Sequence, residues 1–250
     1  MQFIQNLINN NISVVDYMKA PIIEVFSSIQ GEGLFIGKRQ IFIRFAGCNL
    51  DCKYCDTNNS KNTSSGIPLS LKELHTKINN LMTPDFHAIS FTGGEPLLQA
   101  DYIKKFHEIK DYPMLLETNG TLPKQVKKIA KYVDYASVDI KLPEHFEDVN
   151  TEDIISHEIE SANILISRGA KVYCKAVVLP KTKVDTIVNI SERIHSEIED
   201  SSKISLIIQP SSPISEWGKY TQKLFEMSEM VGENLDVRVI PQIHTILDIR

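Results

Sequence analysis

Cysteine is scarce in this chain of 250 residues. Only four cysteines occur, and three of them lie between Cys48 and Cys55. The intervals between these three cysteines are too short for them to serve as an extracellular disulfide framework. The pattern therefore excludes a secreted protein built on disulfides and indicates a reducing compartment.

Long apolar runs and an excess of positive charge are also absent. No uninterrupted apolar stretch approaches the roughly 20 residues that a membrane-spanning helix needs. The segment from Met1 to Leu7 lacks the basic start and apolar region of a secretory signal. The formal net charge of −5 provides no general attraction for phosphate backbones or anionic lipid. We therefore expect a cytoplasmic protein whose partners include neither nucleic acid nor membrane.

The residues that are present make an ordinary globular composition. Hydrophobic residues account for 42% of the chain and charged residues for 24%, which separates it from disordered and membrane proteins. No stretch is rich enough in proline, glycine or serine to divide the chain. Hydrophobic periodicity is weak at the start, so we predict an N-terminal extension over residues 1–20 and a single domain over residues 21–250.

Strand and helix patterns alternate along this domain. Apolar runs predict six main strands, beginning near residues 41, 88, 114, 135, 172 and 204, with amphipathic stretches between them. One helix opens with the capping-box pattern Ser70-Leu71-Lys72-Glu73. This alternation is typical of a parallel sheet with helical crossovers. Since six βα units are fewer than a closed (β/α)8 barrel contains, we predict an α/β fold built as an incomplete TIM-type barrel.

Polar segments follow several of the predicted strands. In barrels and open parallel sheets, functional residues gather at the carboxyl ends of the strands. Arg44 is unusual because it interrupts an apolar strand, where a charged side chain is rarely buried without a partner. The segments at strand ends are the cysteine loop, Thr92–Glu95, Glu117–Asn119, Asp139–Lys141 and Gln209–Pro210.

Three of the cysteines form the pattern C-x-x-x-C-x-x-C. Cys48, Cys52 and Cys55 follow an apolar strand and lie in a predicted loop. A structural zinc site normally has four protein ligands and an ordinary iron-sulfur cluster four cysteines, so three thiolates suggest a metal site with one open position. A zinc site with a distant fourth ligand remains the alternative. Cys174 stands apart in an apolar strand, where we expect it to pack as a small hydrophobic residue.

The cysteine spacing after one core strand, and Gly93-Gly94-Glu95 after the next, resemble the radical S-adenosylmethionine enzymes. The resemblance implies that the three cysteines bind three irons of a [4Fe-4S] cluster and that S-adenosylmethionine binds the fourth iron. It also implies a protein that orients the cofactor and excludes water. The cofactor contacts it implies are Tyr54, Asp56, Gly93, Gly94, Glu95, Ser137, Asp139, Lys141, Gln209 and Ser212.

A closer resemblance covers the chain from about residue 22 to its end. The segments Ser28–Gly33, Phe42–Leu50, Cys55–Thr57 and Pro241–His244 are similar to the 7-carboxy-7-deazaguanine synthase family. That family implies a radical rearrangement of 6-carboxy-5,6,7,8-tetrahydropterin to 7-carboxy-7-deazaguanine, with loss of ammonia and with Mg2+ near the substrate carboxylate. It further implies an external one-electron donor of the flavodoxin or ferredoxin type and a homodimer.

This substrate gives two residues near the cysteines a specific role. Arg44 at a strand end is suited to a two-point contact with a carboxylate. Thr57 offers a hard oxygen ligand for Mg2+. An ion pair for Arg44 and an ordinary loop hydroxyl for Thr57 remain as alternatives, as do a turn cap for Glu117 and a packing role for His244. The implied substrate contacts are Ile29, Gln30, Gly31, Arg44, Thr92, Glu117 and His244, and the implied catalytic set is Cys48, Cys52, Cys55, Arg44 and Thr57.

Two other functions are compatible with parts of the pattern. A radical S-adenosylmethionine activase, which abstracts hydrogen from a glycine of a partner protein, would share the cluster and would need a large docking face. A zinc-stabilised interaction module would use the cysteines without catalysis. Measuring iron and sulfide content distinguishes the zinc-stabilised module from the two enzymes. Turnover of the pterin distinguishes the activase from the synthase.

Overall fold

The computed structural model describes residues 17–147 and 149–249. Within these residues the strands form one sheet in the order β3-β1-β2-β4-β5-β6-β7-β8-β9. From β2 to β9 neighbouring strands are parallel, whereas β1 is antiparallel to β2 and to β3. The strands are β1 (Lys19–Ile29), β2 (Arg39–Phe45), β3 (Ile67–Ser70), β4 (Phe86–Gly93), β5 (Met114–Thr118), β6 (Tyr135–Ile140), β7 (Lys171–Val178), β8 (Ser205–Pro210) and β9 (Asp236–Val239).

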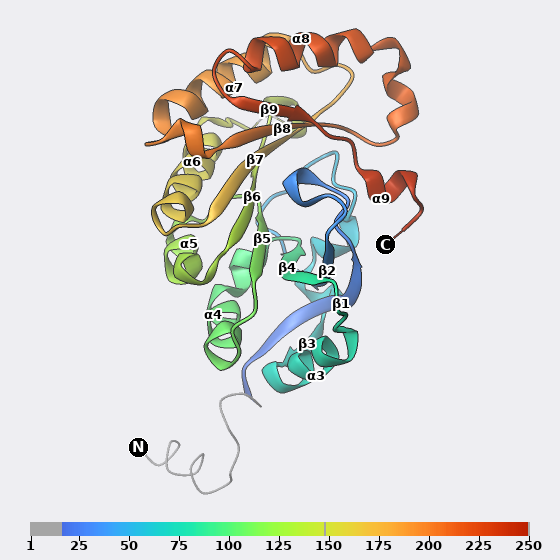
Figure 1. The fold of residues 1–250 in the computed structure, drawn as a ribbon, viewed down its shortest axis with the longest axis vertical. Helices are drawn as coiled ribbons and strands as arrows, with labels where there is room; N and C mark the ends of the chain where they lie inside the picture. The colour runs from blue at the N-terminus through green and yellow to red at the C-terminus, as the bar shows by residue number, and fades with distance from the viewer. Residues whose placement is uncertain (1–16, 148, 250) are drawn as a thin grey trace, which may run out of the picture.

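Helices follow each of the six predicted strands. The order β2-α3-β4-α4-β5-α5-β6-α6-β7-α7-β8-α8 gives the six predicted βα units, and β9 adds a last parallel strand. The described sheet has β3 and β9 as its two edges, so the prediction of an incomplete barrel is confirmed. Figure 1 shows α4 to α8 along one side of the sheet. The helices are α3 (Leu71–Leu81), α4 (Ala100–Ile109), α5 (Pro123–Ile129), α6 (Glu152–Ser167), α7 (Val184–Glu197), α8 (Thr221–Val231) and α9 (Ile243–Ile246).

The two faces of the sheet bury different sets of side chains. The large apolar core includes Leu116 and Cys174, whereas a small second cluster contains Leu115, Tyr173 and Phe35. Because successive strand residues point to opposite faces, the second cluster marks the inner face. Phe35, from the turn after β1, therefore packs inside the incomplete barrel and anchors the adjoining loop there.

The N-terminal boundary differs from the predicted one. Residues 1–16 of the predicted extension lie outside the described residues. Lys19 and Ala20 already belong to β1, where they pair with β3, and Ala20 is 1% exposed. The sheet therefore begins before residue 21, because strand pairing extends an apolar run that local periodicity leaves short. No helix among the described residues combines the length and apolar character needed to cross a membrane.

Candidate active site

A cavity of about 920 Å³ opens at the carboxyl ends of the parallel strands. Strand alternation explains its polar lining. Side chains two residues apart in a strand point to the same face of the sheet. Leu115 and Tyr173 lie on the inner face, so Glu117 and Lys175 lie on that face too. Arg44, Thr92 and Asp139 also line the cavity from their own strands. The alternation of side chains along parallel strands therefore brings these polar strand-end residues together.

The glycines after β4 allow two loops to pack closely. Gly94 N–H donates to Phe45 O (3.1 Å) and Glu95 N–H to Gly47 O (2.8 Å). A Cβ on Gly93 would lie 2.2 Å from Phe45 O, and one on Gly94 would lie 2.2 Å from Gly47 O. Side chains at these positions would push the loop away. Both glycines line the cavity, so the close approach also places their backbone beside the cysteines.

The three clustered cysteines all line the cavity as free thiols. Burial raises the pKa of Cys48, and it raises the pKa of Cys52 to about 11. Both thiols are therefore protonated at neutral pH until a metal supplies positive charge. Leu50 N–H also donates to Cys48 Sγ at 3.5 Å, a contact that suits a metal-bound sulfur. Three cysteine thiolates are the type and number of donors that an iron-sulfur cluster with one iron left free requires.

Tyr54 lies between the cysteines and a buried histidine. Its ring centroid is 4.1 Å from that of His145, and its hydroxyl accepts a hydrogen bond from Lys141 Nζ at 2.8 Å. His145 Nδ1 accepts from Leu142 N–H (2.9 Å) and Nε2 donates to Val177 O (2.9 Å). Burial lowers the pKa of His145 to about 3, so the ring is neutral. It therefore fixes the orientation of Tyr54 without contributing charge.

Two lysines and two carboxylates form a buried chain beside Tyr54. Asp139 Oδ2 lies 2.8 Å from Lys141 Nζ, and Asp139 Oδ1 lies 3.3 Å from Lys175 Nζ. Lys175 Nζ also lies 2.6 Å from Glu32 Oε2. Burial opposes ionisation of all four groups, but the paired charges outweigh it. The Lys175 ammonium lowers the pKa of Glu32, both lysines lower that of Asp139, and Asp139 raises the pKa of each lysine. All four groups are therefore charged at neutral pH.

The loop after β1 is tied to the base of the cavity. Gln30 Nε2 donates to Glu117 Oε1 at 2.8 Å, and Ser90 Oγ donates to the same oxygen at 2.8 Å. Gln30 Oε1 accepts from Glu32 N–H at 3.1 Å. Glu117 is thus held by side chains from two other segments, which is more than a turn cap requires.

The C-terminal segment crosses from β9 to this loop. Ile243 N–H donates to Gly31 O at 2.9 Å, and a Cβ on Gly31 would lie 2.5 Å from His244 Nδ1. Figure 1 shows α9 beside the loop between β1 and β2. His244 lines the cavity together with Gly31 and Ile29. The predicted substrate contacts at opposite ends of the chain therefore come together.

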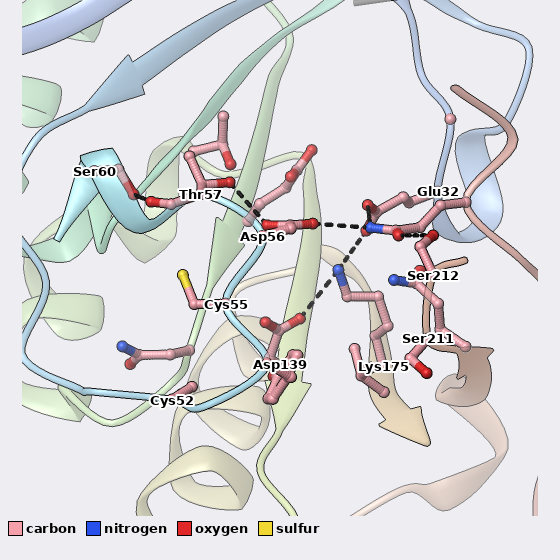
Figure 2. A pocket seen from close by; sticks show the side chains of 18 of the residues that line it. Glu32, Cys52, Cys55, Asp56, Thr57, Ser60, Asp139, Lys175, Ser211 and Ser212 are labelled. Atoms are coloured by element: carbon pink, nitrogen blue, oxygen red, sulfur yellow. Dashed lines mark hydrogen bonds and ion pairs between the residues drawn. The ribbon is translucent and has the colours of Figure 1, made fainter. Parts of the chain in front are cut away.

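Gln242 connects three segments of the cavity wall. Its Nε2 donates to Glu32 Oε1 (2.8 Å) and to Asp56 Oδ2 (3.0 Å), and its Oε1 accepts from Ser212 Oγ (2.6 Å). Figure 2 shows Asp56, Glu32 and Ser212 converging on this point from different elements. A neutral amide can contact both carboxylates without adding charge.

Arg44 and Thr57 each have a neighbouring carboxylate. Arg44 Nε donates to Glu24 Oε1 at 2.8 Å, while the residue also lines the cavity. The ion pair with Glu24 therefore coexists with a place in the cavity lining. Thr57 Oγ1 donates to Asp56 Oδ1 at 2.8 Å, and Thr57 also lines the cavity. The pair of oxygens from Asp56 and Thr57 is chemically suited to Mg2+.

Two buried carboxyl groups, those of Glu95 and Glu158, accept hydrogen bonds from residues at the carboxyl ends of the strands. Glu95 is fully buried and accepts hydrogen bonds from Thr118 Oγ1 (2.7 Å) and Asn119 N–H (2.8 Å). Burial raises the pKa of Glu95 to about 7. Glu158 from α6 accepts from Lys141 N–H at 3.1 Å. Glu95 and Ser137 are absent from the cavity lining, unlike the other predicted cofactor and substrate contacts.

Four residues of the site were missed by the sequence analysis. Lys175 carried the same signal as Arg44, a charge within an apolar strand, and Glu32 stood inside the Gln-Gly-Glu-Gly motif. Gln242 lay in the C-terminal segment Pro241–His244. His145 had no local signal, because two of its ring contacts come from distant segments, Val177 O in β7 and the Tyr54 ring in the cysteine loop.

Comparisons with known proteins agree with this geometry. The chain matches the Radical SAM superfamily over residues 42–208. The 7-carboxy-7-deazaguanine synthase of Methanothermobacter thermautotrophicus is 50% identical over 244 residues, covering 93% of this chain and 99% of that protein. The protein of the same name from Methanocaldococcus jannaschii is 38% identical over 90% of this chain and 98% of its own. The crystal structure of QueE from Escherichia coli matches with a TM-score of 0.56 and 20% identity, over 88% of this chain and 93% of that one. At that identity the structural match supports the fold.

Proposed function

The chain belongs to the 7-carboxy-7-deazaguanine synthase family of the radical SAM superfamily, and from this premise we propose a function for each part of the cavity. The reaction is the Mg2+-dependent conversion of 6-carboxy-5,6,7,8-tetrahydropterin to 7-carboxy-7-deazaguanine with loss of ammonia, a step in the biosynthesis of 7-deazapurines such as queuosine. The cofactors are a [4Fe-4S] cluster, S-adenosylmethionine and Mg2+.

One observation carries the assignment of the site. The three cysteines and the Gln30–Glu32 loop lie in different parts of the chain, yet they line a single cavity at the strand ends. A cavity of about 920 Å³ is within the usual range for a small-molecule site. A cofactor and a substrate that must react with each other require such a shared space.

The cysteine side of the cavity holds the cofactors. Cys48, Cys52 and Cys55 bind the cluster, which together with S-adenosylmethionine supplies the one-electron chemistry when bound. The remaining contacts orient S-adenosylmethionine and exclude water. They are Tyr54, Asp56, Asp139, Lys141, Gln209, Ser212 and the backbone of Gly93 and Gly94, while Glu95 and Ser137 support these elements from positions outside the cavity lining.

The opposite side holds the substrate. Arg44 binds the substrate carboxylate, with Glu24 fixing the guanidinium through Nε. Thr57, oriented by Asp56, provides an oxygen ligand for Mg2+. The polar edge of the pterin faces a set of donors and acceptors from both ends of the chain, namely Ile29, Gln30, Gly31, Thr92, Glu117 and His244.

Further properties of the enzyme follow from its chemistry. A reduced cluster needs an external one-electron donor, which we assign to the flavodoxin or ferredoxin class. The four free thiols and the cluster favour the reducing cytoplasm. We also propose that the enzyme is a homodimer, as the family resemblance implies. Residues from Lys19 onward form one domain, because the sheet is continuous from β1 to β9.

Turnover tests the proposed function. Anaerobically reconstituted, reduced enzyme given S-adenosylmethionine, Mg2+ and 6-carboxy-5,6,7,8-tetrahydropterin should release 7-carboxy-7-deazaguanine, detected by mass spectrometry. The Cys52→Ala variant is the control and should yield none. Cleavage of S-adenosylmethionine by the wild-type enzyme without formation of the deazapurine would overturn the substrate assignment.

A further inference from the structure

A chain of polar contacts runs through the cavity wall, and both of its ends lie in the cysteine loop. It starts at Asp56 in the cysteine loop and returns to the same loop at Tyr54, two residues away. Each contact is a hydrogen bond or ion pair of 2.6 to 3.3 Å. Figure 2 shows the part of this chain around Glu32, Lys175 and Asp139. In order, the chain is Asp56, Gln242, Glu32, Lys175, Asp139, Lys141 and Tyr54.

Lys175 and Gln242 connect the two functional halves of the cavity. Glu32 lies in the loop that carries Gln30 and Gly31, on the substrate side. Lys175 joins Glu32 to Asp139, and Gln242 joins Glu32 to Asp56 and Ser212, all on the cofactor side. The position of the substrate loop is therefore tied to the cofactor contacts from two directions.

Burial makes these links strong and specific. The Lys175 side chain is 12% exposed and Gln242 is 8% exposed. Charge-assisted hydrogen bonds are strengthened where water is excluded, and a buried carboxylate without its partner is costly. Glu32 thus has one favourable position, set by Lys175 and Gln242 together. A ligand that orders Asp139 and Asp56 also orders the loop around Glu32.

We propose that Lys175 and Gln242 are positioning residues that couple the binding of S-adenosylmethionine to the binding of the substrate. This inference rests on the proposed function, because it names the two ligands of the same cavity. The coupling is reciprocal, so each ligand tightens the binding of the other. The first ligand to bind orders the segments that the second one needs, which reduces the ordering that the second must cause.

Binding without turnover tests the coupling. The reconstituted enzyme is kept with its cluster oxidised and no reductant, and calorimetry measures the Kd of S-adenosylmethionine with and without saturating 6-carboxy-5,6,7,8-tetrahydropterin and Mg2+. In the wild-type enzyme the pterin should tighten binding by about fivefold or more. In Lys175→Met and in Gln242→Leu the ratio of the two Kd values should fall to less than about twofold.

Further variants separate coupling from loss of structure. The double variant Glu32→Gln/Lys175→Met leaves no unpaired Glu32 charge, so it should fold and bind iron normally while the coupling stays lost. Lys127→Met removes the exposed ion pair between Lys127 on α5 and Glu160 on α6 and should keep the wild-type ratio. A wild-type ratio near one, or a full ratio in Lys175→Met and Gln242→Leu, overturns the inference. In either case a positive turnover assay leaves the proposed function standing.

Discussion

Arg44 and Lys175 show how single charged residues mark this site. Each lies on the inner face of its strand among mostly apolar residues, and each is paired with a carboxylate from another segment, Glu24 for Arg44 and both Glu32 and Asp139 for Lys175. A lone charge in such a position would carry a desolvation cost of several kcal/mol. The sequence reveals that a partner is required, but it does not identify the partner, because the pairing depends on strand register and loop packing.

Thr57 should affect the metal without affecting the cluster. Replacing Thr57 with alanine removes the hydroxyl next to Asp56 and should raise the Mg2+ concentration for half-maximal turnover by about tenfold. Thr57→Ser keeps the hydroxyl and should restore the wild-type value. Iron content per chain, measured in parallel, should be unchanged, because Thr57 supplies no sulfur. Loss of iron in Thr57→Ala would contradict this assignment.

The four cysteines should separate into two classes. Cys174 is fully buried in β7 within the apolar core, and burial raises the pKa of its thiol. Cys174→Ala should lower the free energy of unfolding by about 1 kcal/mol through the small cavity it leaves, with iron content unchanged. Cys52→Ala should instead abolish cluster binding. Iron analysis and denaturant unfolding of both variants check the distinction, and loss of iron in Cys174→Ala would refute it.

Glu95 should make stability depend on pH. Its folded-state pKa of about 7 exceeds the ordinary 4.5 because of burial. The contribution of the protonated group is complete below pH 4.5 and is lost as pH rises through 7, by up to about 3 kcal/mol. Wild-type enzyme should therefore lose thermal stability relative to Glu95→Gln between about pH 5 and pH 8. A constant difference in melting temperature across this range would show that Glu95 is not titrating.

Sequence patterns predict helices and strands correctly where interactions between neighbouring residues determine the structure. The Ser70 capping box is present, with Ser70 N–H donating to Glu73 Oε2 at 2.7 Å, and the strand predicted to begin near residue 135 begins at Tyr135. The segment after β8 does not form one continuous α-helix but a 3₁₀ helix, Ile214–Lys219, followed by α8. There Trp217 is buried and its indole donates to Ser211 O, a tertiary contact that helical periodicity does not encode.

The contact between the β4 loop and the cysteine loop should depend on Gly93. An alanine there would place its Cβ 2.2 Å from Phe45 O at a φ of 130°, which we expect to cost about 3 kcal/mol. The displaced loop should also reduce iron binding. Gly218→Ala is the matched control, since nothing lies within 4 Å of its Cβ. Melting temperature and iron content measure both effects, and equal behaviour of the two variants would contradict the packing argument.

At the scale of the whole molecule, the incomplete barrel leaves a gap that the C-terminal segment spans. The described sheet ends at β9, and the chain then returns to the β1–β2 loop through Ile243 and Gln242. Sequence patterns predict the strands and their carboxyl-end site, because these follow from periodicity and parallel order. They do not predict this closure, since a contact between residues 31 and 243 is set by the curvature of the entire sheet.

Removing the C-terminal segment should therefore separate cluster binding from substrate binding. A chain ending at Ile240 keeps all three cluster cysteines and the strands that position them, so its iron content should be unchanged. It loses Gln242, His244 and the bond from Ile243 to Gly31, so the Kd of the pterin, measured without reductant, should rise at least about tenfold. A chain ending at Asp248 keeps α9 and its contacts with the loop after β1 and serves as the control. If the shorter chain bound the pterin as tightly as the control, the loop after β1 would hold its position alone, and the closing role of this segment would be wrong.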